Sequence, residues 1–354
     1  MFTHMKCLVA AGFALTLLVA SNKSSAKGWF GVTQKKTSIA GNERALLERA
    51  KHLSRFEQYE KAKALLASVI SAVESSQPVD YSLLARAQID QAMVLSALKE
   101  IEEARVVLAK AAVLVDRHLG KAHLMNASLL TAKGILANNN YERRSGERYL
   151  REAVSALEKA KCEDPLLWFE ALEALAKVML WNNKPEQARV RLQQAIKRAS
   201  KGNALAKGLA VEGMVFLAMR ADLTKEKEKS ERLLFEAIDL ARSKGVNPSF
   251  FARAATKTAD YLFTMDYKNA TRAGKLLDKA ISSLKGIEAD DSGIEYIARF
   301  TRAMVAFVEG KLALAQRQAQ WCLRWCEKKG KDEQKIAKEL FLLGRYYLVA
   351  KEYS

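Results

Sequence analysis

Residues 59–70, YEKAKALLASVI, carry small and apolar side chains at a spacing that recurs six more times along the chain. The related stretches begin at residues 101, 144, 185, 227, 270 and 312. Aligned on its first small residue, each stretch contributes one of Ala62, Ala104, Gly146, Ala188, Ser230, Ala273 and Ala315. Five of the six intervals are 42 residues long and the sixth is 43, so the sequence is an array of repeats.

Each repeat contains the pattern of two helices. Four, seven and eight residues after the small residue come further apolar or small residues, such as Leu66, Val69 and Ile70 in the first repeat. These spacings place the side chains on one face of a helix. A partner helix is expected upstream, because a second small residue precedes the first by twelve positions, or by fourteen in the sixth repeat. This second set is Ala50, Ala92, Gly134, Ala176, Ala218, Ala259 and Ala303.

Helix-breaking residues fall between these segments. The 354 residues include only 4 Pro and 17 Gly, which favours long helices over a sheet of many strands. Pro78, Pro165 and Pro248 lie between repeats, and Pro185 begins a second helix, where its missing N–H costs little. The sequence therefore predicts an all-α protein built from antiparallel helix pairs.

The pattern resembles the tetratricopeptide repeat (TPR) family. The resemblance is carried by small and apolar pairs of the first helix, such as Ala50 with Leu53, and by second-helix runs of the form YEKA or PEQA. It implies a right-handed α-superhelix, or solenoid, over residues 42–354, with extended 42-residue units. We expect about seven helix pairs, followed by a terminal helix that caps the array.

The N-terminus has the pattern of a secretory signal. Lys6 precedes an apolar run over residues 7–20, which is too short to span a bilayer comfortably, and Ser24 and Ala26 supply small residues for cleavage. We predict a signal peptide over residues 1–26 and a flexible segment over residues 27–41. The mature chain would then lack a transmembrane span and be periplasmic or secreted. The alternative is an uncleaved helix that anchors the chain.

The formal net charge is +18, and it becomes +16 if Lys6 and Lys23 leave with the signal peptide. A basic chain favours anionic partners, which include an acidic protein, nucleic acid and an envelope glycan. Nucleic acid is the less favoured partner, because an exported chain rarely meets it and because the basic residues alternate with glutamates. The leading hypothesis is a non-catalytic scaffold that binds a protein or peptide. The alternative is a basic binder of an anionic polymer.

The sequence contains no motif that indicates an enzyme, a cofactor site or a metal site. It has no glycine-rich phosphate loop, nucleophile elbow or paired metal-binding histidines. The carboxylates lie next to Lys and Arg, which predicts solvated polar helix faces. No catalytic residue, cofactor or metal is therefore expected.

A ligand is expected on the concave surface, which first helices line in such arrays. Carboxylate-clamping members of the family carry Lys and Asn at fixed first-helix positions, but here Met93 stands where Asn would follow Lys51, so that ligand is not predicted. Mixed methionine, aromatic and basic side chains suit an extended peptide or a helix. The candidate partner-binding residues are Lys51, Met93, Lys177, Trp181, Met219, Phe307, Trp321 and Arg345.

Cysteines and tryptophans alternate over residues 321–326, WCLRWC. Cys322 and Cys326 occupy repeat positions that are small or apolar elsewhere, so we expect buried thiols rather than a metal site or a disulfide. Trp321 occupies a position that is polar in the other repeats. We expect Trp321 and Trp325 to pack on the terminal helix near Tyr347, with an exposed aromatic patch as the alternative.

Overall fold

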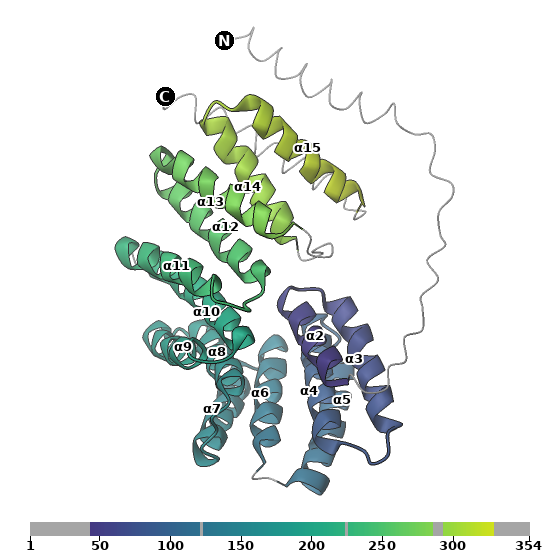
Figure 1. The fold of residues 1–354 in the computed structure, drawn as a ribbon. Coiled ribbons are helices and arrows are strands. Elements are labelled where there is room, and N and C mark those ends of the chain that lie inside the picture. Colours follow the sequence, from purple (N-terminus) through teal and green to yellow (C-terminus); the bar gives the residue numbers. More distant parts are fainter. Residues whose placement is uncertain (1–42, 121–122, 224–225, 286–292, 329–354) are drawn as a thin grey trace, which may run out of the picture. The chain divides into compact units, whose positions relative to one another are not determined.

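The computed structural model describes residues 43–120, 123–223, 226–285 and 293–328 (Figure 1). These residues form α-helices and short turns, without a β-strand in the described ranges. The helices are α2 (Glu43–Arg55), α3 (Tyr59–Glu74), α4 (Tyr81–Ala97), α5 (Ile101–Leu114, continued by a π-helical turn Val115–Leu119), α6 (Leu124–Asn139), α7 (Arg143–Lys159), α8 (Pro165–Trp181), α9 (Pro185–Ala199), α10 (Ala204–Leu223), α11 (Lys227–Ala241), α12 (Pro248–Met265), α13 (Ala270–Ser283, after a 3-10 turn Tyr267–Asn269), α14 (Ile294–Val308) and α15 (Leu312–Lys328).

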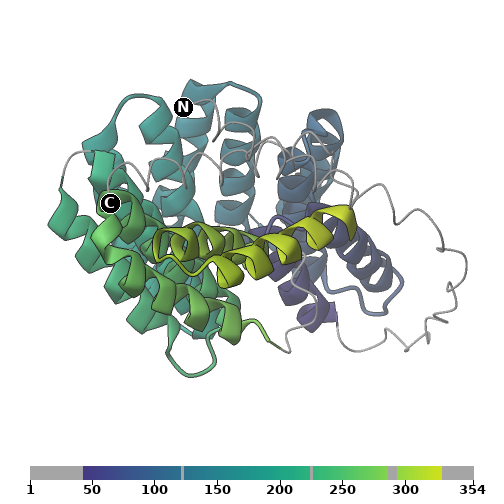
Figure 2. The same ribbon diagram turned by 90° about the horizontal axis from the view of Figure 1, so that it is seen from above.

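Successive helices pack as pairs, from α2 with α3 to α14 with α15. The first helix of each pair also contacts the first helix of the next pair, which aligns α2, α4, α6, α8, α10, α12 and α14. Figures 1 and 2 show the pairs following one another in a curved row. The expected all-α array is therefore confirmed, with seven helix pairs in the described ranges.

Several expectations concern parts of the chain outside the described residues. They are the signal peptide over residues 1–26, the segment over residues 27–41 and the terminal capping helix. Within the described ranges, no helix has both the length and the apolar character needed to cross a bilayer.

The small residues of the repeat lie where two helices of a pair approach each other. The second-helix residues from Ala62 to Ala315 are all buried. In the third pair the helices approach closely at Gly146, where a Cβ atom would lie 3.0 Å from the carbonyl oxygen of Gly134. In the fifth pair the Oγ of Ser230 donates a hydrogen bond of 2.8 Å to the carbonyl oxygen of Ala218. Bulkier side chains at these positions would push the helices apart.

The turn within a pair also repeats. Glu57, Lys99, Tyr141 and Asn183, which follow one another at 42-residue intervals, each have a positive φ between 58° and 70°. The next residue's N–H closes each helix end, as when Glu142 donates to the carbonyl oxygen of Ala137 at 2.8 Å. This is a left-handed helix cap, for which glycine is the usual residue.

We predict that Tyr141→Gly stabilises the protein by about 0.5–1 kcal/mol. A left-handed φ costs a non-glycine residue about 1–2 kcal/mol, and glycine relieves this cost at the expense of unfolded-state entropy. Tyr141 is 82% exposed, so its side chain contributes little packing. The urea midpoint of unfolding measures the gain. Tyr141→Ala is the matched control, and it should give no gain because alanine keeps the strained φ. An equal gain from both variants would contradict the prediction.

Candidate functional site

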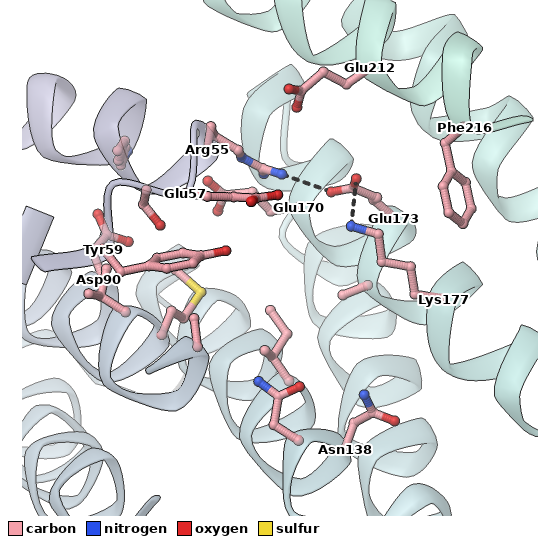
Figure 3. Close-up of a pocket in the computed structure, with 18 of the residues that line it drawn as sticks. Arg55, Glu57, Tyr59, Asp90, Asn138, Glu170, Glu173, Lys177, Glu212 and Phe216 are labelled. Atoms are coloured by element: carbon pink, nitrogen blue, oxygen red, sulfur yellow. Dashed lines mark hydrogen bonds and ion pairs between the residues drawn. The ribbon is translucent and has the colours of Figure 1, made fainter. Parts of the chain in front are cut away.

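A cavity of about 670 Å³ lies against the first helices of six successive pairs (Figure 3). Its lining comes from α2, α4, α6, α8, α10 and α12, with further residues from α3 and from the turn between α2 and α3. The repeat explains this arrangement, because equivalent positions of neighbouring first helices face the same side. The cavity therefore collects side chains that are far apart in the sequence.

Arg86 on α4 is buried and links three first helices beside the cavity. Its Nε lies 3.1 Å from Oδ1 of Asp90, one turn along the same helix. Its Nη2 donates to both carboxylate oxygens of Glu170 on α8, at 3.0 and 2.9 Å, and its Nη1 donates to Oγ of Ser128 on α6 at 3.2 Å. Ser128 lies 42 residues and Glu170 84 residues after Arg86. The three residues therefore occupy the same position in successive repeats, and their side chains are joined in one hydrogen-bonded ionic group.

A second ionic group centres on Glu173 of α8. Its carboxylate accepts a hydrogen bond from Nη1 of Arg55 at 3.0 Å and pairs with Nζ of Lys177 at 2.9 Å. Burial alone would raise the pKa of Glu173, but Lys177 and Arg55 together lower it to about 2. The neighbouring Glu212 pairs with Arg253 at 2.6 Å, and here burial outweighs the cation and raises the pKa.

The cavity carries no net formal charge, although the whole chain is strongly basic. Five cations and five anions line it. The cations are Lys51, Arg55, Lys177, Arg253 and Lys257, and the anions are Glu57, Asp90, Glu170, Glu173 and Glu212. The positive excess of the chain is therefore carried by residues outside this lining.

The C-terminal halves of α4, α6, α8 and α10 supply an apolar wall. It comprises Met93, Ile135, Trp181, Phe216 and Met219. Trp181 is 51% exposed and Met219 is 37% exposed, although both belong to large apolar residue types. An apolar wall beside a charged but neutralised one is suited to non-covalent binding of a polypeptide.

The structure brings together five of the eight candidate binding residues. Lys51, Met93, Lys177, Trp181 and Met219 all line the cavity. Four of them, all except Trp181, occupy the same position in their repeats, which explains why they lie together. That these residues bind a partner remains a prediction.

The other three candidates lie elsewhere. Phe307 on α14 packs against the core of the later pairs. Trp321 on α15 lies beneath the guanidinium of Arg299, 4.5 Å from the ring centroid, while Trp325 stacks on Tyr296 at 4.8 Å. Both tryptophans thus contact α14. The terminal helix on which Trp321 and Trp325 were expected to pack lies outside the described residues, and so does Arg345.

The expectation that the carboxylates lie on solvated faces is wrong for the cavity. Glu170, Glu173 and Glu212 are mostly shielded from solvent, with side chains 17%, 11% and 12% exposed. One sequence signal could have identified this ionic wall. Arg86, Glu170 and Glu212 all stand six residues before the first-helix small residue, so a charged residue recurs at one repeat position.

The two cysteines of the WCLRWC stretch are buried. Cys322 and Cys326 are 5% and 3% exposed and are not bonded to each other, as their repeat positions predicted. Burial and the neighbouring Cys326 raise the pKa of Cys322 to about 12, so its thiol stays protonated near neutral pH. Among the described residues, no group of three or more His, Cys, Asp or Glu is placed to hold a metal ion.

No protein-family model matches the sequence, and no curated protein matches it either. Several solved structures are similar to it in fold, among them the following three. The apo form of RapI is 15% identical, with 86% of this chain and 82% of that chain covered and a TM-score of 0.58. Aspartyl phosphate phosphatase F from Bacillus subtilis is 15% identical, with 90% and 82% covered and a TM-score of 0.52. A tetratricopeptide repeat protein from Parabacteroides merdae is 14% identical, with 85% and 98% covered and a TM-score of 0.43.

The chain has a TPR-like fold. The seven stacked helix pairs and the similarity to solved helical-repeat structures agree on this architecture. At identities near 15%, the similarity describes the fold and leaves the ligand open.

We predict that Glu173→Gln lowers the free energy of unfolding by about 3 kcal/mol at neutral pH. The change leaves the partly buried Arg55 without its carboxylate partner. The pKa of Glu173 is about 2 in the folded chain and 4.5 ordinarily, so its contribution is complete above pH 4.5 and is lost as the pH falls toward 2. The difference between wild type and variant should therefore shrink over that interval in urea unfolding.

Glu231→Gln is the matched control. Its carboxylate pairs with Arg272 at 2.9 Å, but the two side chains are 40% and 51% exposed. A surface pair of this kind contributes at most about 1 kcal/mol. Equal effects of the two substitutions, or a Glu173→Gln effect that does not change with pH, would contradict the prediction.

Proposed function

We propose that this chain is a non-catalytic scaffold that holds a segment of a partner protein in the cavity of the first helices. The observation that carries the proposal is the half-exposed apolar wall around Trp181 and Met219 inside a cavity lined by six successive helices. Helical-repeat arrays present such extended surfaces to polypeptides. Apolar residues of this size are seldom left exposed together without a binding role.

A binding role is supported over catalysis by the chemistry of the lining. One of the structures similar in fold is named a phosphatase. In the cavity of this chain, however, the buried carboxylates are neutralised by arginine or lysine, and histidine is absent from the lining residues. A carboxylate held in an ion pair is a poor general base. These groups therefore organise the wall.

We also propose that the chain acts in the cell envelope, in the periplasm. The support is the N-terminal sequence, in which a basic residue, a short apolar run and small residues precede the repeats. Export would bring the cavity to a partner that resides in the envelope.

Site-specific photo-crosslinking tests both proposals together. We predict that the amino acid p-benzoylphenylalanine, placed at position 181, captures a specific protein in the envelope fraction of the native host. The same amino acid at position 141 is the control, because Tyr141 lies in an exposed turn outside the cavity.

Capture of one protein at 181 but not at 141 would support a binding role of the cavity. Equal capture at both positions, or none at either, would contradict the scaffold. Adducts that occur only in the cytoplasmic fraction would contradict the proposed location while leaving the scaffold in place.

A further inference from the structure

Four of the five carboxylates that line the cavity are paired with cations of the chain. Asp90 and Glu170 pair with Arg86, and Glu173 pairs with Arg55 and Lys177. Glu212 pairs in the same way with Arg253. A cationic ligand that engaged one of these four carboxylates would have to displace a partner from it, which leaves another charge uncompensated and is costly.

The apolar wall, by contrast, is open. Trp181 and Met219 keep 51% and 37% of their surface exposed, and Met93 and Ile135 beside the same cavity are only partly buried. Tryptophan and methionine are enriched at the centres of protein interfaces, where they contact apolar side chains. Burial of the apolar wall by a ligand would therefore stabilise a complex, whereas most of the carboxylates of the lining already have a cationic partner within the chain.

The lining also contains the amide side chain of Asn138 on α6. Asn138 is 8% exposed, and within the described residues no hydrogen-bond donor reaches its Oδ1. Such a buried acceptor costs free energy unless a donor reaches it. A main-chain N–H is a donor that every polypeptide segment except proline provides.

We propose that the cavity recognises an uncharged stretch of polypeptide by one bulky apolar side chain. This side chain packs on Trp181 and Met219. The side chain of Asn138, whose Oδ1 is enclosed in the unbound chain, turns toward the cavity and accepts a hydrogen bond from a main-chain N–H of the same stretch. The inference rests on the proposed scaffold function and specifies its ligand. It also implies that the positive charge of the chain contributes little to recognition at this site, so affinity depends only weakly on salt.

Three pools of short fluorescent peptides test the ligand class. All have a central Leu, Phe or Trp, and the flanking residues are neutral, acidic or basic. Fluorescence anisotropy gives their affinities at low and high salt, about 0.05 and about 0.5 M. The neutral pool should bind most tightly, with an affinity that changes less than about threefold between the two salts. Trp181→Ala should weaken it by at least about tenfold.

Val190→Ala is the matched control, because Val190 is 50% exposed on α9 and does not line the cavity. It should leave the affinity unchanged. Tighter binding of a charged pool, with a steep loss in salt, would overturn this inference. If Trp181→Ala weakened that binding too, the scaffold function would stand. Binding of no pool would count against both.

A second, independent observation concerns Phe56, in the turn between α2 and α3. Its side chain is 1% exposed, yet it belongs to a core cluster of much later helices. Its ring centroid lies 5.3 Å from that of Phe250 on α12, and the guanidinium of Arg253 lies 4.7 Å from its ring. The adjacent Arg55 pairs with Glu173 on α8. In a repeat array, contacts normally join neighbouring pairs only.

We infer that this turn is a clasp that holds the first helix pair against α8 and α12 and closes one side of the cavity. The clasp and the cavity share side chains, because Arg55 and Arg253 belong to both. Opening the clasp would therefore change the cavity wall.

Hydrogen exchange followed by mass spectrometry tests the clasp. Phe56→Ala should accelerate amide exchange in α2 and α12 by at least about tenfold relative to wild type, with helicity retained in circular dichroism. Phe56→Leu, which keeps most of the volume, should give a smaller effect at the same helices. Arg44→Ala is the control on α2, because Arg44 is 83% exposed in its pair with Asp80. Unchanged exchange in α12, or a uniform increase in all helices, would overturn the inference.

Discussion

The architecture depends on the close approach of two helices at positions that carry almost no side chain. Alanine, glycine or serine recurs there in every pair, and each of these second-helix residues is buried. Because the approach is tight, a helix cannot rotate without a clash, which fixes the face that it turns to its neighbours. The same face of each first helix then lies beside the same face of the next, and a cavity with a repeating lining follows.

This fixed rotation explains how a strongly basic chain acquires a cavity without net charge. In four successive pairs a residue six positions before the first-helix small residue lies in or beside the cavity, and there the sequence places Arg86, Ser128, Glu170 and Glu212 in turn. Arg86 thus meets Ser128 on the next first helix and Glu170 on the one after it. The charged side chains satisfy one another's hydrogen bonds and are shielded from solvent, so they form a rigid part of the cavity wall. The net charge of the chain does not show which charged residues are paired. It therefore did not predict that the cavity lining carries no net formal charge.

The 42-residue period was enough to predict the helix pairs and four of the residues that line the cavity, because both are properties of equivalent repeat positions. Lys51, Met93 and Lys177 share one such position, as does Met219. The contacts of Phe56 could not be predicted in this way. They join helices nearly two hundred residues apart, and their distance is set by the small rotations that accumulate over the intervening pairs. Nor does the repeat pattern reveal that Glu173 is shared between Arg55 and Lys177.

The clasp changes how the array as a whole would respond to a ligand. In a simple stack, stability is close to a sum of single pairs and nearest-neighbour contacts, so a local event stays local. Here Glu173 is held from two sides, by Arg55 of the first pair and by Lys177 of the cavity wall. A partner that shifts Lys177 would change the ion pair between Glu173 and Arg55. Breaking that ion pair would in turn change the cavity wall that the partner contacts. Linkage is reciprocal. The factor by which closing the clasp raises the affinity for a ligand is therefore the factor by which the bound ligand shifts the clasp toward its closed form. The shared carboxylate thus gives a linear array of repeats a means of acting as one unit.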